Sequence, residues 1–295
     1  MTATLQSALA LDKVHLPPIV IPRDRLYHIG QPFLGWMDRL DLSFEERRLV
    51  HAVVHATCRQ TSEWHGASRP QPVHGHRARL RDLRSAVGLQ ASRSNRSIHA
   101  ALETLPESGL FDFLRVPEAA PRWLEWRLTD MAHEALLDGY HYGHYDIATS
   151  RACRSALDQI LHDHIGGVRR MRQPDLTVFV STVARSLGRE PLWSAVSSQV
   201  TVSLRRLAAA WGIGLAVLAL ETGTMAGIDV LRVRLVHADT QWHNGSPEVM
   251  DTRTRAVTLI APDGRLVRLR ASTTDGIASA ALGAFLKRQG IVQEG

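Results

Sequence analysis

The chain has 295 residues, 44% of them hydrophobic and 22% charged, which excludes collagen-like and intrinsically disordered proteins and suffices for two ordinary domains. Its formal net charge of +6 favours a polyanionic partner. Lys13 and Lys287 are the two lysines among 35 basic residues, and neither has the Gly-Lys-Ser/Thr context of a phosphate-binding P-loop, so that class of ATPase is excluded. The arginine excess suits phosphates and guanine edges, although a GC-rich genome would produce the same bias.

The cysteines and the apolar segments predict a cytoplasmic protein. Cys58 and Cys153 form no CxxC pair, which is typical of a reducing compartment. The N-terminal residues do not combine a basic segment with a following apolar one, so we expect no signal peptide. The longest apolar run, 207–220, is shorter than the roughly 18 residues that span a bilayer, so we expect no membrane span.

The first 60 residues divide into an irregular part and a helix. Prolines interrupt residues 1–40, so we predict an irregular N-terminal arm there. Ser43 and Glu46 have the spacing of a capping box, and apolar residues then recur at helical spacing to about Gln60. A loop rich in Gly, Pro, Ser and His follows, to about His76.

Residues 77–128 carry the most informative pattern. A short helix is ended by Gly88, and a second helix is predicted from about Ser92. Strands are predicted at 111–116 and 123–128, with a wing at 116–122 between them. Helix, turn, helix and strand pair form the winged-helix plan, and the alternative is a plain pair of helices on a two-stranded sheet. The predicted buried positions are Leu80, Leu83, Val87, Ile98, Ala101, Leu102 and Leu105.

The next segment connects two units. We predict a short helix at 130–137, an extended aromatic segment at 140–145, and a helix from Asp146 to about His164 that Gly166 and Gly167 end. Arginines then mark a basic linker. They are Arg169, Arg170 and Arg172.

A second unit repeats the first in outline. Apolar residues at 178–187 precede Gly188, as those at 80–87 precede Gly88, and a longer helix runs from about Pro191 to Trp211. Strands at 215–220 and 228–236 flank a second wing, which suggests a tandem duplication. The tail adds a hairpin of strands 256–261 and 265–271 and a helix at 274–289.

These patterns predict an α+β protein with tandem winged-helix domains and a C-terminal β-hairpin–helix module. The expected organisation is an N-terminal arm at 1–40, winged-helix domain 1 at 41–145, a connecting helix and basic linker at 146–172, winged-helix domain 2 at 173–238, and the tail at 239–295.

A winged helix binds duplex DNA because its second helix fits the major groove, while the wing follows the neighbouring backbone. In the first unit the alternative is a basic solvated face, and in the second a face that contacts protein or forms a dimer. The candidate DNA-binding residues of the first unit are Arg81, Ser92, Arg93, Ser94, Asn95, Arg96, His99 and Arg122. Those of the linker and second unit are Arg169, Arg170, Arg172, Trp193, Ser194, Ser197, Ser198, Gln199, Thr201 and Arg205.

The order of elements resembles the plasmid replication initiators with two tandem winged-helix domains. Residues 42–50, LSFEERRLV, match the opening Leu-Ser-x-x-Glu before a long helix, and the tyrosine-containing segment at 140–145 leads into a connecting helix as in that family. The resemblance covers about residues 40–237, and the histidine-rich loop at 61–76 and the tail after 237 depart from it. It implies binding to repeated origin sites mainly through the second unit, with the first reading an adjacent half-site or mediating dimerisation.

Two other kinds of site compete with DNA binding. His51, His55 and Cys58 share a helix face and precede further histidines at 65, 74 and 76, but no standard zinc spacing is matched, so we expect no metal and no cofactor. A DNA-nicking tyrosine beside a metal held by a His-hydrophobic-His pair is disfavoured, because His162 and His164 flank an aspartate in a helical pattern. We expect no enzymatic activity.

The sequence therefore predicts a specific binder of double-stranded DNA, most simply a plasmid-type replication initiator. The alternative is a bacterial or phage transcriptional regulator, and a third class is a winged-helix module that binds protein. The expected partners are DNA, host replication proteins or RNA polymerase, and a second copy of the chain.

Overall fold

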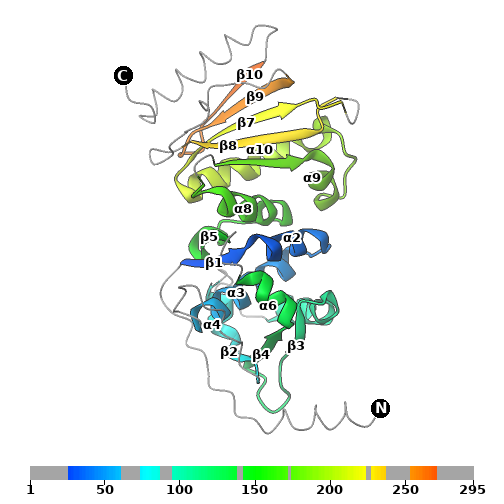
Figure 1. The fold of residues 1–295 in the computed structure, drawn as a ribbon, viewed down its shortest axis with the longest axis vertical. Coiled ribbons are helices and arrows are strands. Elements are labelled where there is room, and N and C mark those ends of the chain that lie inside the picture. Colours follow the sequence, from blue (N-terminus) through cyan, green and yellow to red (C-terminus); the bar gives the residue numbers. More distant parts are fainter. Residues whose placement is uncertain are drawn as a thin grey trace. The chain divides into compact units, whose positions relative to one another are not determined.

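The computed structural model describes residues 26–60, 74–86, 95–137, 142–171, 174–223, 227–236 and 253–270. Helices and strands are mixed over these ranges, as predicted for an α+β protein (Figure 1). The chain divides into two compact units, residues 1–151 and 152–295.

Unit 1 begins with a strand and a helix where the sequence predicted an irregular arm, so that prediction is wrong for residues 26–40. Strand β1 (Leu26–Gly30) pairs antiparallel with β5 (Tyr142–Asp146), and helix α2 (Gln31–Arg39) follows. Pro32 does not break α2 because it lies in the first turn, where the missing N–H has no helical partner to lose. Residues of both elements are fully buried, so this segment belongs to the core.

Helix α3 (Phe44–Gln60) has the predicted capping box. The Ser43 N–H donates to Glu46 Oε2 at 2.6 Å, and the Glu46 N–H donates to Ser43 Oγ at 3.3 Å. Burial alone would raise the pKa of Glu46, but hydrogen bonds from Ser43 and Thr104 outweigh burial and lower it. The carboxylate that caps α3 therefore also holds the end of a later helix.

The rest of unit 1 is a three-stranded antiparallel sheet with helices packed on one side. The predicted strand pair is confirmed, and an additional strand precedes the two helices. The strands lie in the order β2-β4-β3. The elements are β2 (His76–Arg79), α4 (Leu80–Ala86), α5 (Arg96–Thr104), the 3-10 helix η1 (Leu105–Ser108), β3 (Phe111–Arg115), β4 (Trp123–Leu128), α6 (Asp130–Leu136) and α7 (Ile147–Ser150).

Unit 2 opens with helix α8 (Ala156–Val168). The single helix predicted from Asp146 is wrong, because α7 ends at Ser150 and Ser155 then caps α8 by accepting from the Asp158 N–H at 3.2 Å. Gly166 and Gly167 do not end α8 either. Both are buried inside it.

The sheet of unit 2 has five antiparallel strands in the order β10-β9-β7-β8-β6. The predicted hairpin of the tail is confirmed, and it extends this sheet, since β9 pairs with β7. The helix predicted at 274–289 lies outside the described residues. The elements are β6 (Asp175–Phe179), α9 (Val180–Ser186), α10 (Trp193–Trp211), β7 (Gly214–Leu220), β8 (Val230–Val236), β9 (Thr254–Ile260) and β10 (Leu266–Arg270).

The two units share one order of elements: helix, strand, helix, helix and hairpin. In each, the strand before the helix pair lies beside the last strand of the hairpin, as β2 beside β4 and β6 beside β8. The first helix residue is also tied to that last strand in both. The Leu80 N–H donates to the Arg122 carbonyl at 3.0 Å, and the Val180 N–H donates to the Asp229 carbonyl at 2.9 Å. Each helix pair is therefore held to the base of its own hairpin.

Candidate nucleic-acid interface

An open depression of about 480 Å³ lies in unit 1 where α4, the start of α5 and the base of the β3–β4 hairpin meet. Arginines from all sides of it dominate its surface, and none of the described residues that line it is acidic. The lining residues are Arg79, Leu80, Arg81, Arg84, Asn95, Arg122 and Trp123. Two predicted site arginines, Arg81 and Arg122, and Asn95 thus come together here.

The arginines are held by neighbours that leave the depression positive. Arg84 Nη1 donates to Asn95 Oδ1 at 3.0 Å, and the Arg81 side chain pairs with Asp82 at 3.2 Å. The guanidinium carbon of Arg79 lies 5.2 Å from the ring centroid of Trp123. Because four guanidiniums line the depression and none of the described lining residues is acidic, the depression suits an anion such as a phosphodiester.

The outward face of the sheet, which carries Arg79 and Trp123, also holds arginines that are paired with a carboxylate. Arg77 stacks over Trp123 at 4.6 Å and pairs with Glu125 at 3.6 Å, and Arg115 pairs with the same carboxylate at 3.3 Å. Glu125 is buried between its two arginines. Around Glu125 positive charge is thus partly neutralised within the sheet, whereas no acidic residue is among the described residues that line the depression.

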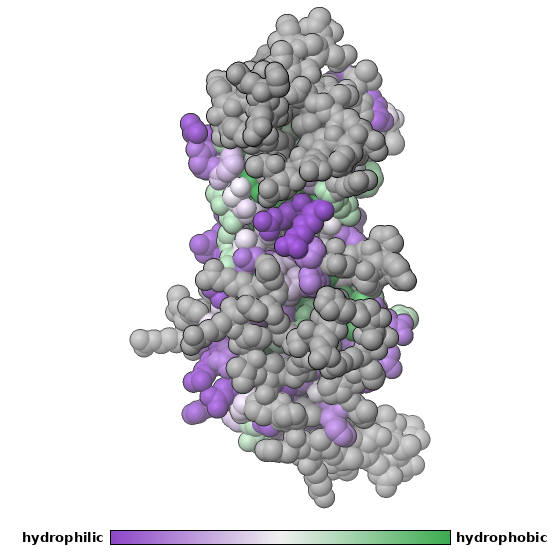
Figure 2. Space-filling model, turned by 60° about the vertical axis from the view of Figure 1, so that its left-hand side comes forward, coloured by the Kyte–Doolittle hydropathy of each residue, from purple (hydrophilic) through white to green (hydrophobic). Residues whose placement is uncertain are grey.

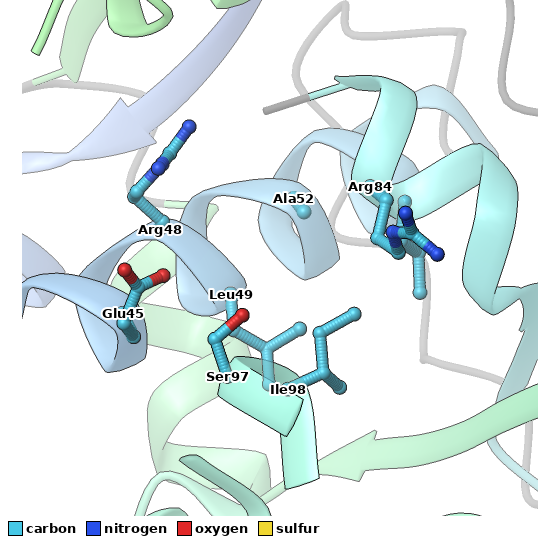
Figure 3. A pocket seen from close by; sticks show the side chains of 8 residues that line it. Glu45, Arg48, Leu49, Ala52, Arg84, Ser97 and Ile98 are labelled. Atoms are coloured by element: carbon cyan, nitrogen blue, oxygen red, sulfur yellow. The ribbon is translucent and has the colours of Figure 1, made fainter. Parts of the chain in front are cut away.

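Helix α5 has its buried and exposed sides where the sequence predicted them. Arg96 and His99 are exposed, and Ile98 and Ala101 are buried. Figure 3 shows Ile98 on α5 turned toward Leu49 on α3, with Arg84 at the side. The apolar contact with α3 therefore fixes which side of α5 faces solvent. The predicted site residues Ser92, Arg93 and Ser94 lie outside the described residues.

In unit 2 the corresponding helix is α10. Its outward face carries Ser194, Ser198 and Arg205, and Trp193, Ser197 and Gln199 are partly exposed beside them. Ser198 Oγ donates to Gln199 Oε1 at 2.7 Å, which orients the amide.

Two of the residues predicted on the reading face of α10 are engaged elsewhere. Thr201 is 8% exposed, and its hydroxyl donates to the Ser197 carbonyl at 2.7 Å, so its place on the reading face is not supported. Arg205 Nε donates to the Gly264 carbonyl at 2.7 Å and thereby holds the turn between β9 and β10 against α10. It binds the protein's own backbone through that atom.

The basic linker lies at the far end of α10 from the predicted base-reading residues. The Arg169 guanidinium stacks 4.6 Å from the ring centroid of Trp211, the last residue of the helix. With about 1.5 Å of rise per residue, Trp193 is roughly 27 Å away along the axis. Arg170 is exposed, and Arg172 lies outside the described residues. Near Trp193 the basic side chains are instead the exposed Arg185 and Arg189, whose Nη1 donates to the Ala195 carbonyl at 2.8 Å.

Sequence reasoning missed three residues of these surfaces. Arg79 and Arg84 lie in an arginine-rich stretch of the sequence, but only the fold shows that they line the depression. Val202 is 51% exposed on α10, although it is apolar. The sequence could have predicted this exposure, because position 202 lies two residues from each of the buried positions 200 and 204 and therefore off the apolar stripe of the helix.

The residues considered for metal or nicking chemistry have other contacts. Tyr27 Oη and His51 Nδ1 are 2.6 Å apart, and Cys58 Sγ donates to the His28 carbonyl at 3.2 Å. His162 is buried and stacks on Trp211. Within the described ranges no three His, Cys, Asp or Glu residues are grouped so as to hold a metal ion. The described helices also include none with the length and hydropathy needed to cross a bilayer.

Comparisons with known proteins find similar solved structures. No family model matches the sequence, and no curated protein matches it. Among solved structures, the fold is similar to that of a replication initiator bound to DNA. The structure is that of the Pi initiator protein in complex with iteron DNA, with a TM-score of 0.54 and 10% identity over 72% of this chain and 98% of that chain. At this identity the likeness concerns the fold.

Proposed function

We propose that the chain is a double-stranded DNA-binding protein with two tandem winged-helix units, which binds repeated sites at a plasmid-type replication origin. The fold likeness to an initiator seen with iteron DNA supports this proposal. So does the common order of elements in the two units, because a helix pair followed by a β-hairpin is the arrangement that inserts a helix into the major groove. The protein acts by binding, without chemistry of its own, and host replication proteins and a second copy are its further partners.

The observation that carries the proposal is the arginine-lined depression of unit 1. It lies beside the first turn of α5 and below the hairpin, where a helix in the major groove brings the DNA backbone closest. Four arginines around about 480 Å³ give a surface for phosphates. Asn95 and Arg96 stand at the start of α5, within reach of base edges.

The two units are proposed to contribute differently to DNA affinity and sequence specificity. Unit 1 supplies most of the salt-dependent attraction to the backbone through its arginines. Unit 2 presents α10, whose outward face before Arg205 is uncharged, and such a face contributes to affinity chiefly where it fits particular base edges. The β9–β10 hairpin belongs to unit 2 and braces α10 through Gly264.

The direct test is to pull down sequenced DNA fragments with the purified full chain at two salt concentrations. Enrichment of directly repeated sites at an origin that persists at the higher salt is the expected result. Enrichment at scattered promoters would replace the initiator with a transcriptional regulator. Loss of all binding, or binding of every sequence alike, would contradict specific DNA recognition and favour a protein-binding module.

A paired set of variants ties the result to the depression. Arg81→Ala combined with Arg122→Ala removes two lining guanidiniums, and we expect binding to weaken on every sequence, with a salt slope reduced by about two for two lost phosphate contacts. Arg39→Ala is the matched control, since it removes an exposed arginine of the same unit from α2. An equal effect of the control would assign the loss to net charge alone.

A further inference from the structure

The outward face of α10 lacks the charges that solvent-exposed helices normally carry. From Trp193 to Leu204 the helix contains no charged residue, although serines at 194 and 198 are exposed. Surface helix faces are usually rich in Lys, Arg and Glu. Uncharged hydrogen-bonding and apolar side chains on an exposed helix face are groups that can read base edges in the major groove.

Val202 lies on this face. Large exposed apolar side chains are few among the described residues. In the view of Figure 2, the coloured part of the molecular surface mixes purple hydrophilic side chains with small green apolar areas. Val202 follows Ser194 and Ser198 at intervals of four residues, so the three side chains form one outward stripe. A valine also lowers helix propensity relative to alanine, so neither solubility nor helix stability accounts for it.

The stripe has limits that define its reach. On the C-terminal side, Arg205 bonds to Gly264, so the β9–β10 turn adjoins the helix there. From Ser194 to Val202 the helix rises about 12 Å, which corresponds to roughly three to four base-pair steps of about 3.4 Å. The stripe therefore offers two hydroxyls and one isopropyl group to a short stretch of groove.

We propose that Val202 contacts the 5-methyl group of a thymine in the major groove. This inference rests on the proposed function and adds to it the base that α10 selects. The thymine methyl is the one apolar group that a base pair presents in the major groove, and apolar side chains are the groups that recognise it. Ser194 and Ser198 bond to the edges of neighbouring bases. No arginine of the stripe is available for guanine, so unit 2 selects an A·T-containing part of the site.

The experiment replaces each thymine of the cognate site by deoxyuridine, which removes only the methyl group, and measures the affinity of the full chain. One position is expected to weaken binding about fourfold, the value that corresponds to burial of one methyl group at about 0.8 kcal/mol. For the Val202→Ala variant, replacing the same thymine by deoxyuridine is expected to leave the affinity unchanged. Val202→Thr keeps one methyl group and retains part of the difference.

The controls separate the outcomes. Met131→Ala removes another exposed apolar side chain and keeps the full deoxyuridine effect. Val202 is exposed, and alanine favours helix, so the variant is expected to fold, which circular dichroism verifies. Specific binding with no deoxyuridine effect, or an effect that persists in Val202→Ala, overturns the thymine contact and leaves the proposed function standing. Absence of specific DNA binding overturns both. A Val202→Ala change in sedimentation without a change in the deoxyuridine effect assigns the stripe to a second copy of the chain.

Discussion

Units 1 and 2 differ at the base of their hairpins. Each unit has the same backbone hydrogen bond there, but the residue that accepts it is Arg122 in unit 1 and Asp229 in unit 2. Arg122 is exposed and lines the depression of unit 1. Asp229, at the same place in unit 2, is buried and accepts from the Thr222 N–H at 2.8 Å and from the Thr222 hydroxyl at 2.5 Å. The same position in the fold therefore carries an exposed arginine in unit 1 and, in unit 2, a buried aspartate that is bonded to Thr222.

The difference separates two uses of a wing. In unit 1 the side chain at the hairpin base is available for a partner, and the fold does not depend on it. In unit 2 the side chain is bonded within the fold, so under the proposed function DNA recognition by this unit depends on α10. Substitutions in the two units test this contrast.

Asp229→Ala is expected to destabilise unit 2 by about 2 to 3 kcal/mol, because it removes a buried carboxylate that accepts two hydrogen bonds from Thr222. Urea unfolding measures the change. Arg122→Ala is the matched variant in unit 1, and its free energy of unfolding should stay within about 0.5 kcal/mol of the wild type. Equal losses in the two variants would break the contrast.

Arg96→Ala is expected to cost about 1 to 3 kcal/mol of binding free energy at a cognate site, with little effect on folding, because Arg96 is exposed at the start of α5. Fluorescence anisotropy on cognate and scrambled duplexes measures it. If both duplexes lose affinity equally, Arg96 contacts phosphate and unit 1 reads no base through it.

Acid should destabilise unit 1. Burial, with a smaller contribution from nearby His133, lowers the pKa of His76 from 6.5 to about 4. The unfolded chain therefore takes up the proton first, and stability present above pH 6.5 falls by at most about 1.4 kcal/mol per pH unit as pH drops toward 4. Burial outweighs Arg232 and Arg234 to raise the pKa of Asp175 in unit 2, so that group acts with the opposite sign.

Thermal unfolding at several pH values checks this prediction. His76→Gln should flatten the pH dependence of unit 1, whereas His99→Gln, at an exposed position of α5, should leave it unchanged. A slope that survives in His76→Gln would assign the acid sensitivity to another group.

Arg170→Ala should give the smallest effect, a decrease of about 0.9 in the slope of log affinity against log salt concentration for one lost phosphate contact. Arg170 is exposed just after α8. Filter binding across a salt series measures the slope, and Arg39→Ala serves as the control. An unchanged slope would remove the basic linker from the interface.

Local rules predicted much of the fold. The capping box at Ser43 and the hairpin of unit 1 follow from short-range patterns, and the structure has both. Strand β2 was missed because its outward residues are arginines and its inward face is short. Helix α2 was missed because Pro32 reads as a breaker in sequence, while its place in the first turn depends on where the helix begins.

The candidate site was less accessible to sequence reasoning. Exposure of Arg96 and His99 follows from helical periodicity, but the gathering of Arg79, Arg84 and Arg122 requires three elements to meet. The position of Arg169 at the wrong end of α10 depends on how α8 packs on that helix, which no local pattern encodes. Ser92, Arg93, Ser94 and Arg172 remain predictions.

The hydrogen bonds from Leu80 to Arg122 and from Val180 to Asp229 involve main-chain atoms alone. Side-chain replacement cannot delete them, with the exception of proline at position 80 or 180, which lacks the donor. The joint between helix pair and hairpin is thus insulated from most mutations, and the residue at position 122 or 229 can change its sign without loosening it. A unit built in this way can change the side chain at its hairpin base and keep the backbone bond that joins the hairpin to the helix pair.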